Sequence, residues 1–249
     1  MKKIIKNLAQ KINSYFRNLR FSNYIKYKSS KKKLVDLDLF NKDYLNQNND
    51  LTQIMQKYGS DKGSTHHNYT DFYHYIFKNL RNKKLNIFEV GLGSVDPKFS
   101  FNMTILQKYS PLCSLRGWKE YFPNSFIFGA DIDTSILNEE LRIKTFYVDM
   151  FSKNITSQMW KKINKKMDII IDDGFHSFNA NTIFYENSID YLNEDGIYII
   201  EDVHRNPKNI KKFYNYFNTK NVLWQFVDIQ NLNNVRDNCL IIIKKKNMI

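Results

Sequence analysis

The chain has 249 residues, enough for one full-sized domain with an appendage, and its 42% hydrophobic and 15% aromatic content excludes a disordered protein. The two cysteines, Cys113 and Cys239, lie far apart without metal-type spacing, which favours a reducing compartment. The net charge of +13 is uneven, because residues 1–35 hold nine Lys, two Arg and no acid and leave +2 for the other 214 residues. We therefore do not expect nucleic acid as a partner of the body of the protein.

The N-terminal 50 residues are predicted to form a basic amphipathic helical arm. Its apolar residues follow a helical spacing and are Ile5, Leu8, Ile12, Phe16 and Leu19. Such a helix can pack on its own domain, pair with a second copy in a homo-oligomer, or lie on an anionic membrane surface. No apolar run reaches the roughly 18 residues of a membrane span, and no signal-peptide core is present. We expect a cytoplasmic protein, with the inner membrane surface as an alternative location.

Residues 51–83 are predicted to form a helical and looped lid, and residues 84–249 the main domain. In that domain short apolar strands alternate with helical segments. The expected strands are 85–90, 125–132, 143–149, 167–172, 196–202, 221–229 and 238–246, and the expected helices are 114–122, 134–141, 155–165, 178–192 and 207–218. This alternation predicts a doubly wound, Rossmann-like α/β fold with a seven-stranded, mostly parallel sheet. The last two strands have no helix between them and should be antiparallel. Ligand sites in such sheets lie beyond the carboxyl ends of the strands.

The first strand ends in "EVGLGS", with Glu89, Gly91 and Gly93. Glycines here permit a tight turn and a close approach of a ligand to the backbone. A dinucleotide fingerprint would need a third glycine where Asp96 stands. The E-x-G-x-G spacing instead resembles the first motif of class I S-adenosylmethionine-dependent methyltransferases, which assigns these three residues to cofactor binding.

Two further acids end the second and third expected strands. Asp131 is placed to accept hydrogen bonds from ribose hydroxyls, and the resemblance implies that Asp149, with the neighbouring Met150, contacts the adenine. Strand-end acids also cap helices, which is the structural alternative for each of them. Their order along the chain favours the cofactor role.

The fourth strand ends in "IIIDDGFH" and the fifth in "YIIEDVH". Asp173, Glu201 and Asp202 should converge there, and clustered carboxylates need protons, basic partners or a cation. An all-oxygen set suits Mg²⁺, Ca²⁺ or Mn²⁺. His176 is placed to take a proton from a hydroxyl, and Asp172 to orient the loop or the cofactor. The alternative is that an aspartate caps the next helix and His176 lies in its first turn.

Four stretches together carry a more specific resemblance: "YGSDKGSTHHNY", "SLRGWKEYFPNSFIFGADID", "DIIIDDGFH" and "GIYIIEDV". In this order they resemble the metal-dependent sugar O-methyltransferases, which modify deoxysugars of the macrolides mycinamicin and macrocin and have relatives in polysaccharide gene clusters. The resemblance covers residues from about 55 to about 205. It implies S-adenosyl-L-methionine as cofactor, Asp173, Glu201 and Asp202 as Mg²⁺ ligands, and His176 as the general base.

The stretch before the first strand should fold over the cofactor from outside the sheet. We assign Lys62 to the cofactor and His67 and Tyr69 to the substrate, with an ordinary loop as the alternative. Residues 94–113 form a connection longer than the usual 2–6 residues and are predicted to be a lid or substrate wall.

Two more residues are substrate candidates. Arg116 could anchor a phosphate or carboxylate, or form a salt bridge on the helix surface, and His204 follows the Glu-Asp pair. The predicted function is Mg²⁺-assisted methyl transfer to a sugar hydroxyl, on a nucleotide-linked or capsule-type surface sugar. The alternatives are N- or O-methylation of a non-sugar small molecule, hydroxylation on a related fold, and a basic-armed binding protein without catalysis.

Overall fold

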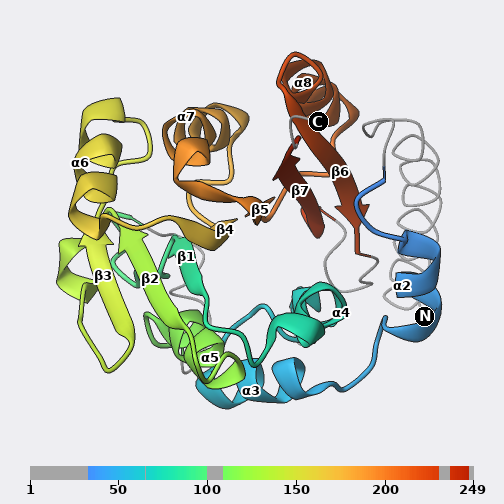
Figure 1. Cartoon of the computed structure of the whole chain (residues 1–249), viewed down its shortest axis with the longest axis horizontal. Helices are drawn as coiled ribbons and strands as arrows, with labels where there is room; N and C mark the ends of the chain where they lie inside the picture. The colour runs from blue at the N-terminus through green and yellow to red at the C-terminus, as the bar shows by residue number, and fades with distance from the viewer. Residues whose placement is uncertain (1–32, 65, 100–108, 230–235, 247–249) are drawn as a thin grey trace, which may run out of the picture.

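The computed structural model of the chain describes residues 33–64, 66–99, 109–229 and 236–246 (Figure 1). The predicted arm helix over 5–19 therefore lies outside the described residues, and so do the expected roles of the arm in self-association and membrane contact. Within the described residues, no helix is both long enough and apolar enough to span a membrane.

One seven-stranded sheet organises the molecule, in the order β3-β2-β1-β4-β5-β7-β6. Its strands are β1 (Asn86–Val90), β2 (Phe126–Asp131), β3 (Ile143–Tyr147), β4 (Met167–Asp172), β5 (Leu192–Ile200), β6 (Val222–Asp228) and β7 (Cys239–Lys245). β3, β2, β1, β4 and β5 pair in parallel, whereas β7 is antiparallel to both β5 and β6. The Rossmann-like, mostly parallel sheet with an antiparallel end is confirmed.

Helices cover both faces of the sheet (Figure 1). They are α2 (Leu37–Asp43), α3 (Asp50–Tyr58), α4 (Tyr69–Phe77) and α5 (Cys113–Tyr121) on one face, and α6 (Lys153–Ile163), α7 (Phe178–Ser188) and α8 (Pro207–Phe217) on the other. Successive residues of a strand point to opposite faces, so Phe88 packs with Trp160 of α6 while Ile87 joins the core that contains Trp118 of α5. Both cores are rich in aromatic rings, which accounts for the high aromatic content of the sequence.

The segment before β1 is packed on the sheet domain. Phe40 of α2 is buried edge-on against Phe72 of α4. The side chain of Gln225 in β6 accepts hydrogen bonds from the backbone N–H groups of Leu34 and Val35 at 2.7 and 3.1 Å. Helices α2, α3 and α4 therefore form a layer fixed to one face of the sheet.

The predicted helix over 134–141 was wrong. Only a 3₁₀ turn at Thr134–Ile136 forms, with Asp133 as its N-cap. The backbone of Glu140 then pairs with Ile143, and Arg142 adopts a positive φ of 63°. The chain therefore reverses directly into β3, with Ile136 and Leu137 packed against the core and Leu141 85% exposed.

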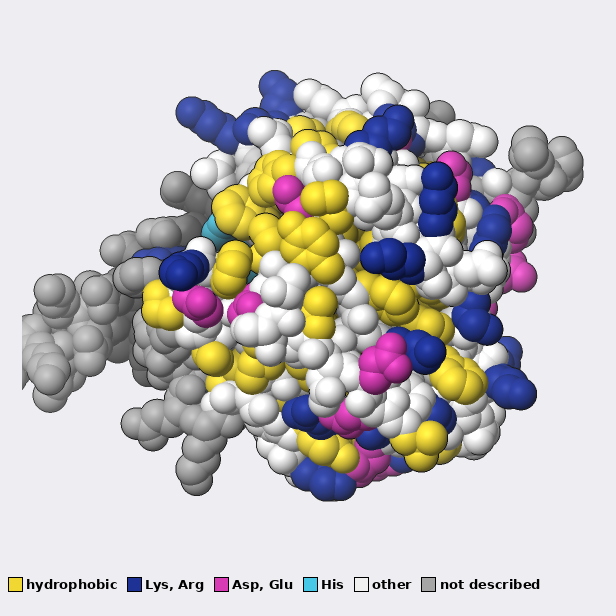
Figure 2. Space-filling model, turned by 90° about the vertical axis from the view of Figure 1, so that its left-hand side faces the viewer, with side chains coloured by type: hydrophobic (Ala, Val, Ile, Leu, Met, Phe, Trp, Pro, Cys, Tyr) yellow, Lys and Arg dark blue, Asp and Glu magenta, His cyan; other side chains and the backbone are white. Residues whose placement is uncertain are grey.

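Other boundaries differ by a few residues. β3 ends at Tyr147, short of Asp149, and α7 ends at Ser188 before a 3₁₀ turn leads into β5. Figure 2 shows basic, acidic and apolar side chains interspersed on the face over α6 and β3, consistent with a body that carries little net charge.

Candidate active site

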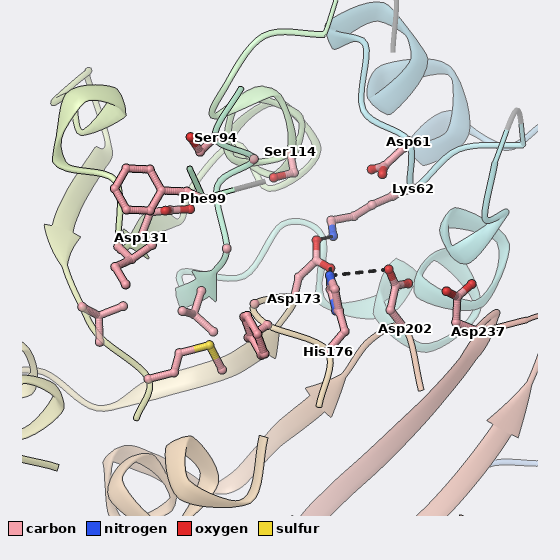
Figure 3. Close-up of a pocket in the computed structure, with 18 of the residues that line it drawn as sticks. Asp61, Lys62, Ser94, Phe99, Ser114, Asp131, Asp173, His176, Asp202 and Asp237 are labelled. Carbon is pink, nitrogen blue, oxygen red and sulfur yellow. Dashed lines mark hydrogen bonds and ion pairs between the residues drawn. The ribbon is translucent and has the colours of Figure 1, made fainter. Parts of the chain in front are cut away.

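A cavity of about 590 Å³ lies at the carboxyl ends of the parallel strands, within the range of small-molecule sites. Its walls come from the segments that follow β1, β2, β3, β4 and β5, and from the loop between α3 and α4. Figure 3 shows Asp131 toward one end of this cavity and Asp173, His176 and Asp202 grouped toward the other. The cavity therefore has two ends with different chemistry.

The first end is built on the glycine turn after β1. Gly91 and Gly93 have φ angles of 90° and 75°, which side chains rarely adopt. A Cβ on Gly91 would lie 1.9 Å from the carbonyl oxygen of Asp173, so the turn can pass β4 only without a side chain. Asp131 fixes the turn, because its Oδ2 accepts a hydrogen bond from the N–H of Leu92 at 2.6 Å.

Acidic and apolar residues surround this first end. Asp131 and Asp149 line the cavity, as do Ile132, Met150 and Phe151 beside them. Burial raises the pKa of Asp131, while hydrogen bonds from backbone N–H groups, including that of Asp133, oppose the shift. The two carboxylates can accept hydrogen bonds from the polar groups of a ligand. A planar ring of the same ligand can pack on the neighbouring apolar side chains.

The second end brings together Asp173, His176 and Asp202. His176 Nε2 lies 3.7 Å from Asp202 Oδ2 and 4.0 Å from Asp173 Oδ1. One ligand atom from each residue falls within 4.8 Å of the others, a grouping that could hold a metal ion. His176 and Asp202 both have positive φ angles, 51° and 52°. Strained backbone of this kind persists where the surrounding structure enforces it, and it is common at functional sites.

The imidazole of His176 has an unusual environment. Among the described residues its Nδ1 is buried without a hydrogen-bond partner. Burial acts to lower the pKa of His176, but the carboxylates of Asp202, Asp173 and Asp172 outweigh it and raise the pKa. His176 is therefore well placed to hold a proton.

A buried lysine lies behind this group. Lys62 Nζ contacts Asp173 Oδ2 at 2.5 Å (Figure 3), and it contacts Glu201 Oε2 at 2.6 Å. Burial opposes the charge of Lys62, but Asp173 and Glu201 raise its pKa well above the usual value. Burial also raises the pKa of Asp173, to about 7, and that of Glu201 well above its ordinary range. For Asp202 burial acts in the same direction, but His67 and His176 outweigh it and lower the pKa.

Most of the residues singled out in the sequence reach the cavity. Those that line it are Lys62, His67, Gly91, Gly93, Asp131, Asp149, Met150, Asp173, His176, Asp202 and His204. Tyr69 lies behind the wall and donates to Asp202 Oδ1 at 2.7 Å. Asp172 is fully buried and accepts a hydrogen bond from Tyr198, which fits an orienting role under the loop.

Besides Tyr69 and Asp172, three more expected residues do not line the cavity. Glu89 is buried and accepts hydrogen bonds from Ser114 and Trp118 at 2.6 and 2.5 Å, so it anchors α5 beneath the glycine turn. Arg116 pairs with Glu140 at 2.8 Å, so the surface salt bridge rather than the substrate anchor is observed. Glu201 lies behind the wall, bound to Lys62.

Several lining residues were missed in the sequence. They are Ser60, Asp61, His66, Val90, Ser94, Phe99, Tyr109, Ser114, Ile132, Val148, Phe151, Gly174, Phe175 and Asp237. Ile132, Phe151 and Phe175 directly follow or precede predicted site residues, and that adjacency was a usable signal. Asp237 gave none, because the end of the chain reaches the site only through the pairing of β7 with β5. Of these lining residues, Ser94, Phe99 and Tyr109 belong to the wall predicted at 94–113, although they were not singled out there, and residues 100–108 lie outside the described residues.

No protein-family model matches the chain. Among curated proteins it is 29% identical over 156 residues to mycinamicin VI 2''-O-methyltransferase of Micromonospora griseorubida, covering 62% of this chain and 36% of that protein. It is 27% identical to demethylmacrocin O-methyltransferase of Streptomyces fradiae, with the same coverage, 62% and 36%. The corresponding identity to a tetracenomycin rhamnosyl 2'-O-methyltransferase of Streptomyces olivaceus is 28%, over 61% of this chain and 37% of that protein. The predicted resemblance is confirmed.

The chain spans little more than a third of the length of these relatives. Among solved structures it is similar to the MycE methyltransferase from the mycinamycin biosynthetic pathway, in complex with Mg, SAH and mycinamycin VI. The TM-score is 0.59 at 21% sequence identity, over 79% of this chain and 54% of that one. A second MycE structure, with Mg and SAH, gives a TM-score of 0.60. This likeness supports the same sheet architecture.

The glycine turn yields a prediction about both ends of the cavity. Replacing Gly91 with alanine should shift the end of β4 and destabilise the fold by about 1–3 kcal/mol, because of the positive φ and the contact with Asp173. The free energy of unfolding and the affinity for S-adenosylhomocysteine would be measured together. Gly63→Ala is the matched control, since its Cβ would meet the flexible Gln56 side chain at 3.2 Å and the Ser60 carbonyl oxygen at an ordinary contact distance of 3.8 Å. Equal behaviour of the two variants would contradict the steric role of Gly91.

Proposed function

We propose that the chain is an S-adenosylmethionine-dependent O-methyltransferase that acts on a sugar hydroxyl with the help of a divalent cation, Mg²⁺ by preference. The observation that carries this proposal is that one cavity holds both groups. The glycine turn and the strand-end acids lie at one end of it, and the carboxylate-histidine group lies at the other. The relatives named as sugar O-methyltransferases, and a similar structure that holds Mg and SAH, support it.

The cofactor end fits S-adenosylmethionine in its chemistry. Asp131 and Asp149 can accept hydrogen bonds from ribose hydroxyls and the adenine amino group. Ile132 and Phe151, 43% and 50% exposed, give apolar surface to a planar ring. The glycine turn lets the rest of the cofactor approach the backbone.

The other end fits a divalent cation. Asp173 and Asp202 supply the oxygen ligands that Mg²⁺, Mn²⁺ and Ca²⁺ prefer, and His176 beside them would keep its Nε2 for the proton of the acceptor hydroxyl. When bound, such an ion polarises a hydroxyl and lowers its pKa. The ion would also offset the negative charge of the carboxylates at this end of the cavity. Burial raises the pKa of one of them, Asp173, to about 7.

His176 is proposed as the general base. The acceptor oxygen forms a bond to the methyl carbon while the carbon–sulfur bond breaks and its electron pair stays on sulfur, giving S-adenosylhomocysteine. His176 Nε2 takes the hydroxyl proton, and Asp202 and Asp173 beside it stabilise the resulting imidazolium. The cavity walls supply proximity and orientation.

The charges of the cavity bear on the form of the acceptor. Its described lining residues include six aspartates, namely Asp61, Asp131, Asp149, Asp173, Asp202 and Asp237. Lys62, the one lysine in this set, is already paired with Asp173 and Glu201, and the set contains no arginine. Apart from a cation bound by Asp173 and Asp202, these residues offer a diphosphate no arginine and no lysine without an acidic partner, and the other aspartates would repel it. Of the two acceptor forms expected from the sequence, we therefore favour a sugar already transferred to a glycan or other aglycone over a nucleotide-linked sugar.

The base is tested by His176→Asn, since asparagine tolerates the positive φ of this position. Methyl transfer from labelled S-adenosylmethionine should fall about 10²–10⁴-fold while the affinity for S-adenosylhomocysteine is kept. His74→Asn in α4, outside the cavity, is the control. Undiminished transfer by His176→Asn would contradict the assignment.

The acceptor is tested with one sugar in two forms, its methyl glycoside and its nucleoside-diphosphate derivative. We expect transfer to the glycoside, and no inhibition by the free nucleoside diphosphate at equal concentration. Preferential methylation of the nucleotide sugar would contradict the electrostatic argument.

A further inference from the structure

One carboxylate of the cavity is used neither by the adenosine part of the cofactor nor by the cation. Two of the six lining aspartates lie at the adenosine end, and two more belong to the cation group. A fifth, Asp237, lies with its Oδ2 3.9 Å from His204 Nδ1. The sixth, Asp61, is half-buried, and within the described part of the chain its carboxylate takes part in no hydrogen bond or ion pair. It can therefore accept hydrogen bonds from a ligand.

Asp61 lies close to the glycine turn. A Cβ on Gly93 would lie 1.8 Å from the hydroxyl oxygen of Tyr109, so this hydroxyl packs directly on the turn. Burial raises the pKa of Tyr109, and the neighbouring Cys113 and the charge of Asp61 raise it further. The carboxylate of Asp61 therefore lies near the same hydroxyl.

Asp61 also lies toward the cation end of the cavity. Its chain neighbour Lys62 contacts Asp173 at 2.5 Å. In Figure 3, Asp131 lies on one side of Ser114, and Asp61 lies on the other side, next to Lys62. A ligand that extends from Asp131 past the glycine turn toward the cation group would reach Asp61.

The cofactor carries a charged group that has to lie in this region. The amino-acid part of S-adenosylmethionine is attached to the same sulfur as the methyl group, so it lies within a few bonds of the reacting centre beside His176. Its α-ammonium has three N–H donors, and a cation removed from water is costly without an opposite charge. Asp173 and Asp202 would be occupied by the divalent cation. Asp61 is placed to supply the charge that the ammonium needs.

Ser60 can bind the other charged group of the amino acid. It is buried and lines the cavity directly before Asp61. Its Oγ accepts a hydrogen bond from the backbone N–H of Lys62 at 3.3 Å, which leaves the hydroxyl proton for another acceptor. The α-carboxylate of the cofactor is an acceptor that fits this proton.

We propose that Asp61 and Ser60 bind the amino-acid part of S-adenosylmethionine, Asp61 at the α-ammonium and Ser60 at the α-carboxylate. The sulfur is then held from both sides, by the adenosine and by the amino acid, and this fixes the direction of the methyl group toward the acceptor hydroxyl. This assignment rests on the proposed function, because it concerns the cofactor of that site.

Asp61 is tested by calorimetry with two compounds that differ in the amino acid. S-adenosylhomocysteine carries the ammonium without the sulfonium charge, and 5'-methylthioadenosine has the same adenosine and sulfur but no amino acid. Asp61→Asn should weaken binding of S-adenosylhomocysteine about 10–100-fold, because a hydrogen bond to a charged group is lost, and should leave binding of 5'-methylthioadenosine unchanged. Asp237→Asn, a change at another aspartate of the cavity, is the matched control and should alter neither affinity.

Equal losses for the two compounds, or an unchanged affinity for S-adenosylhomocysteine, would overturn the role of Asp61. A wild-type protein that binds both compounds equally well would also overturn it, because the amino acid would then contribute nothing. A folded wild-type protein that binds neither compound would contradict the proposed function itself.

Ser60 provides a second measurement that does not depend on Asp61→Asn. Ser60→Ala should weaken binding of S-adenosylhomocysteine about 2–10-fold, and it should not weaken binding of the decarboxylated form, which keeps the ammonium. An equal loss for both forms would mean that Ser60 acts only through the N–H of Lys62, and would overturn its assignment to the carboxylate.

Discussion

The excess of carboxylates at one edge of the sheet is the constraint on which the rest of the site depends. Parallel strands bring Glu89, Asp173, Glu201 and Asp202 to neighbouring positions, and burial raises the pKa of Asp173 and Glu201. Such a group is stable only with cations close by. The protein supplies one of them itself, the ammonium of Lys62.

The layer of helices before β1 supplies side chains that bind these carboxylates. The loop between α3 and α4 carries Lys62, and α4 directs the hydroxyls of Tyr69 and Tyr73 to Asp202 and Glu201. The helices therefore do more than cover one face of the sheet. They fix which carboxylate oxygens stay turned into the cavity, and so where a cation and an acceptor hydroxyl can meet the cofactor.

Much of the fold was predictable from the sequence because it depends on local pattern. Apolar runs predicted all seven strands, and their last residues marked the edge of the sheet that carries Asp131, Asp173 and Asp202. The helix expected over 134–141 does not form, because the chain turns at Thr134–Ile136 and the backbone of Glu140 then pairs with Ile143. The local pattern therefore predicted where the strands end, but not which side chains from different segments contact one another there.

The site was less predictable where it depends on contacts between distant segments. Lys62 and Glu201 are 139 positions apart, and no local pattern shows that their side chains meet. Arg116 had two plausible partners, and only the fold decides for Glu140. Asp237 reaches the cavity because β7 returns between β5 and β6.

The central claim, a cavity with separate cofactor and cation ends, is tested most directly by calorimetric titration of S-adenosylhomocysteine, with and without Mg²⁺. We predict that the wild type binds the compound, that Asp173→Ala still binds it but no longer binds Mg²⁺, and that Asp131→Ala loses it. Failure of the folded wild-type protein to bind S-adenosylhomocysteine in either condition would contradict the methyltransferase assignment.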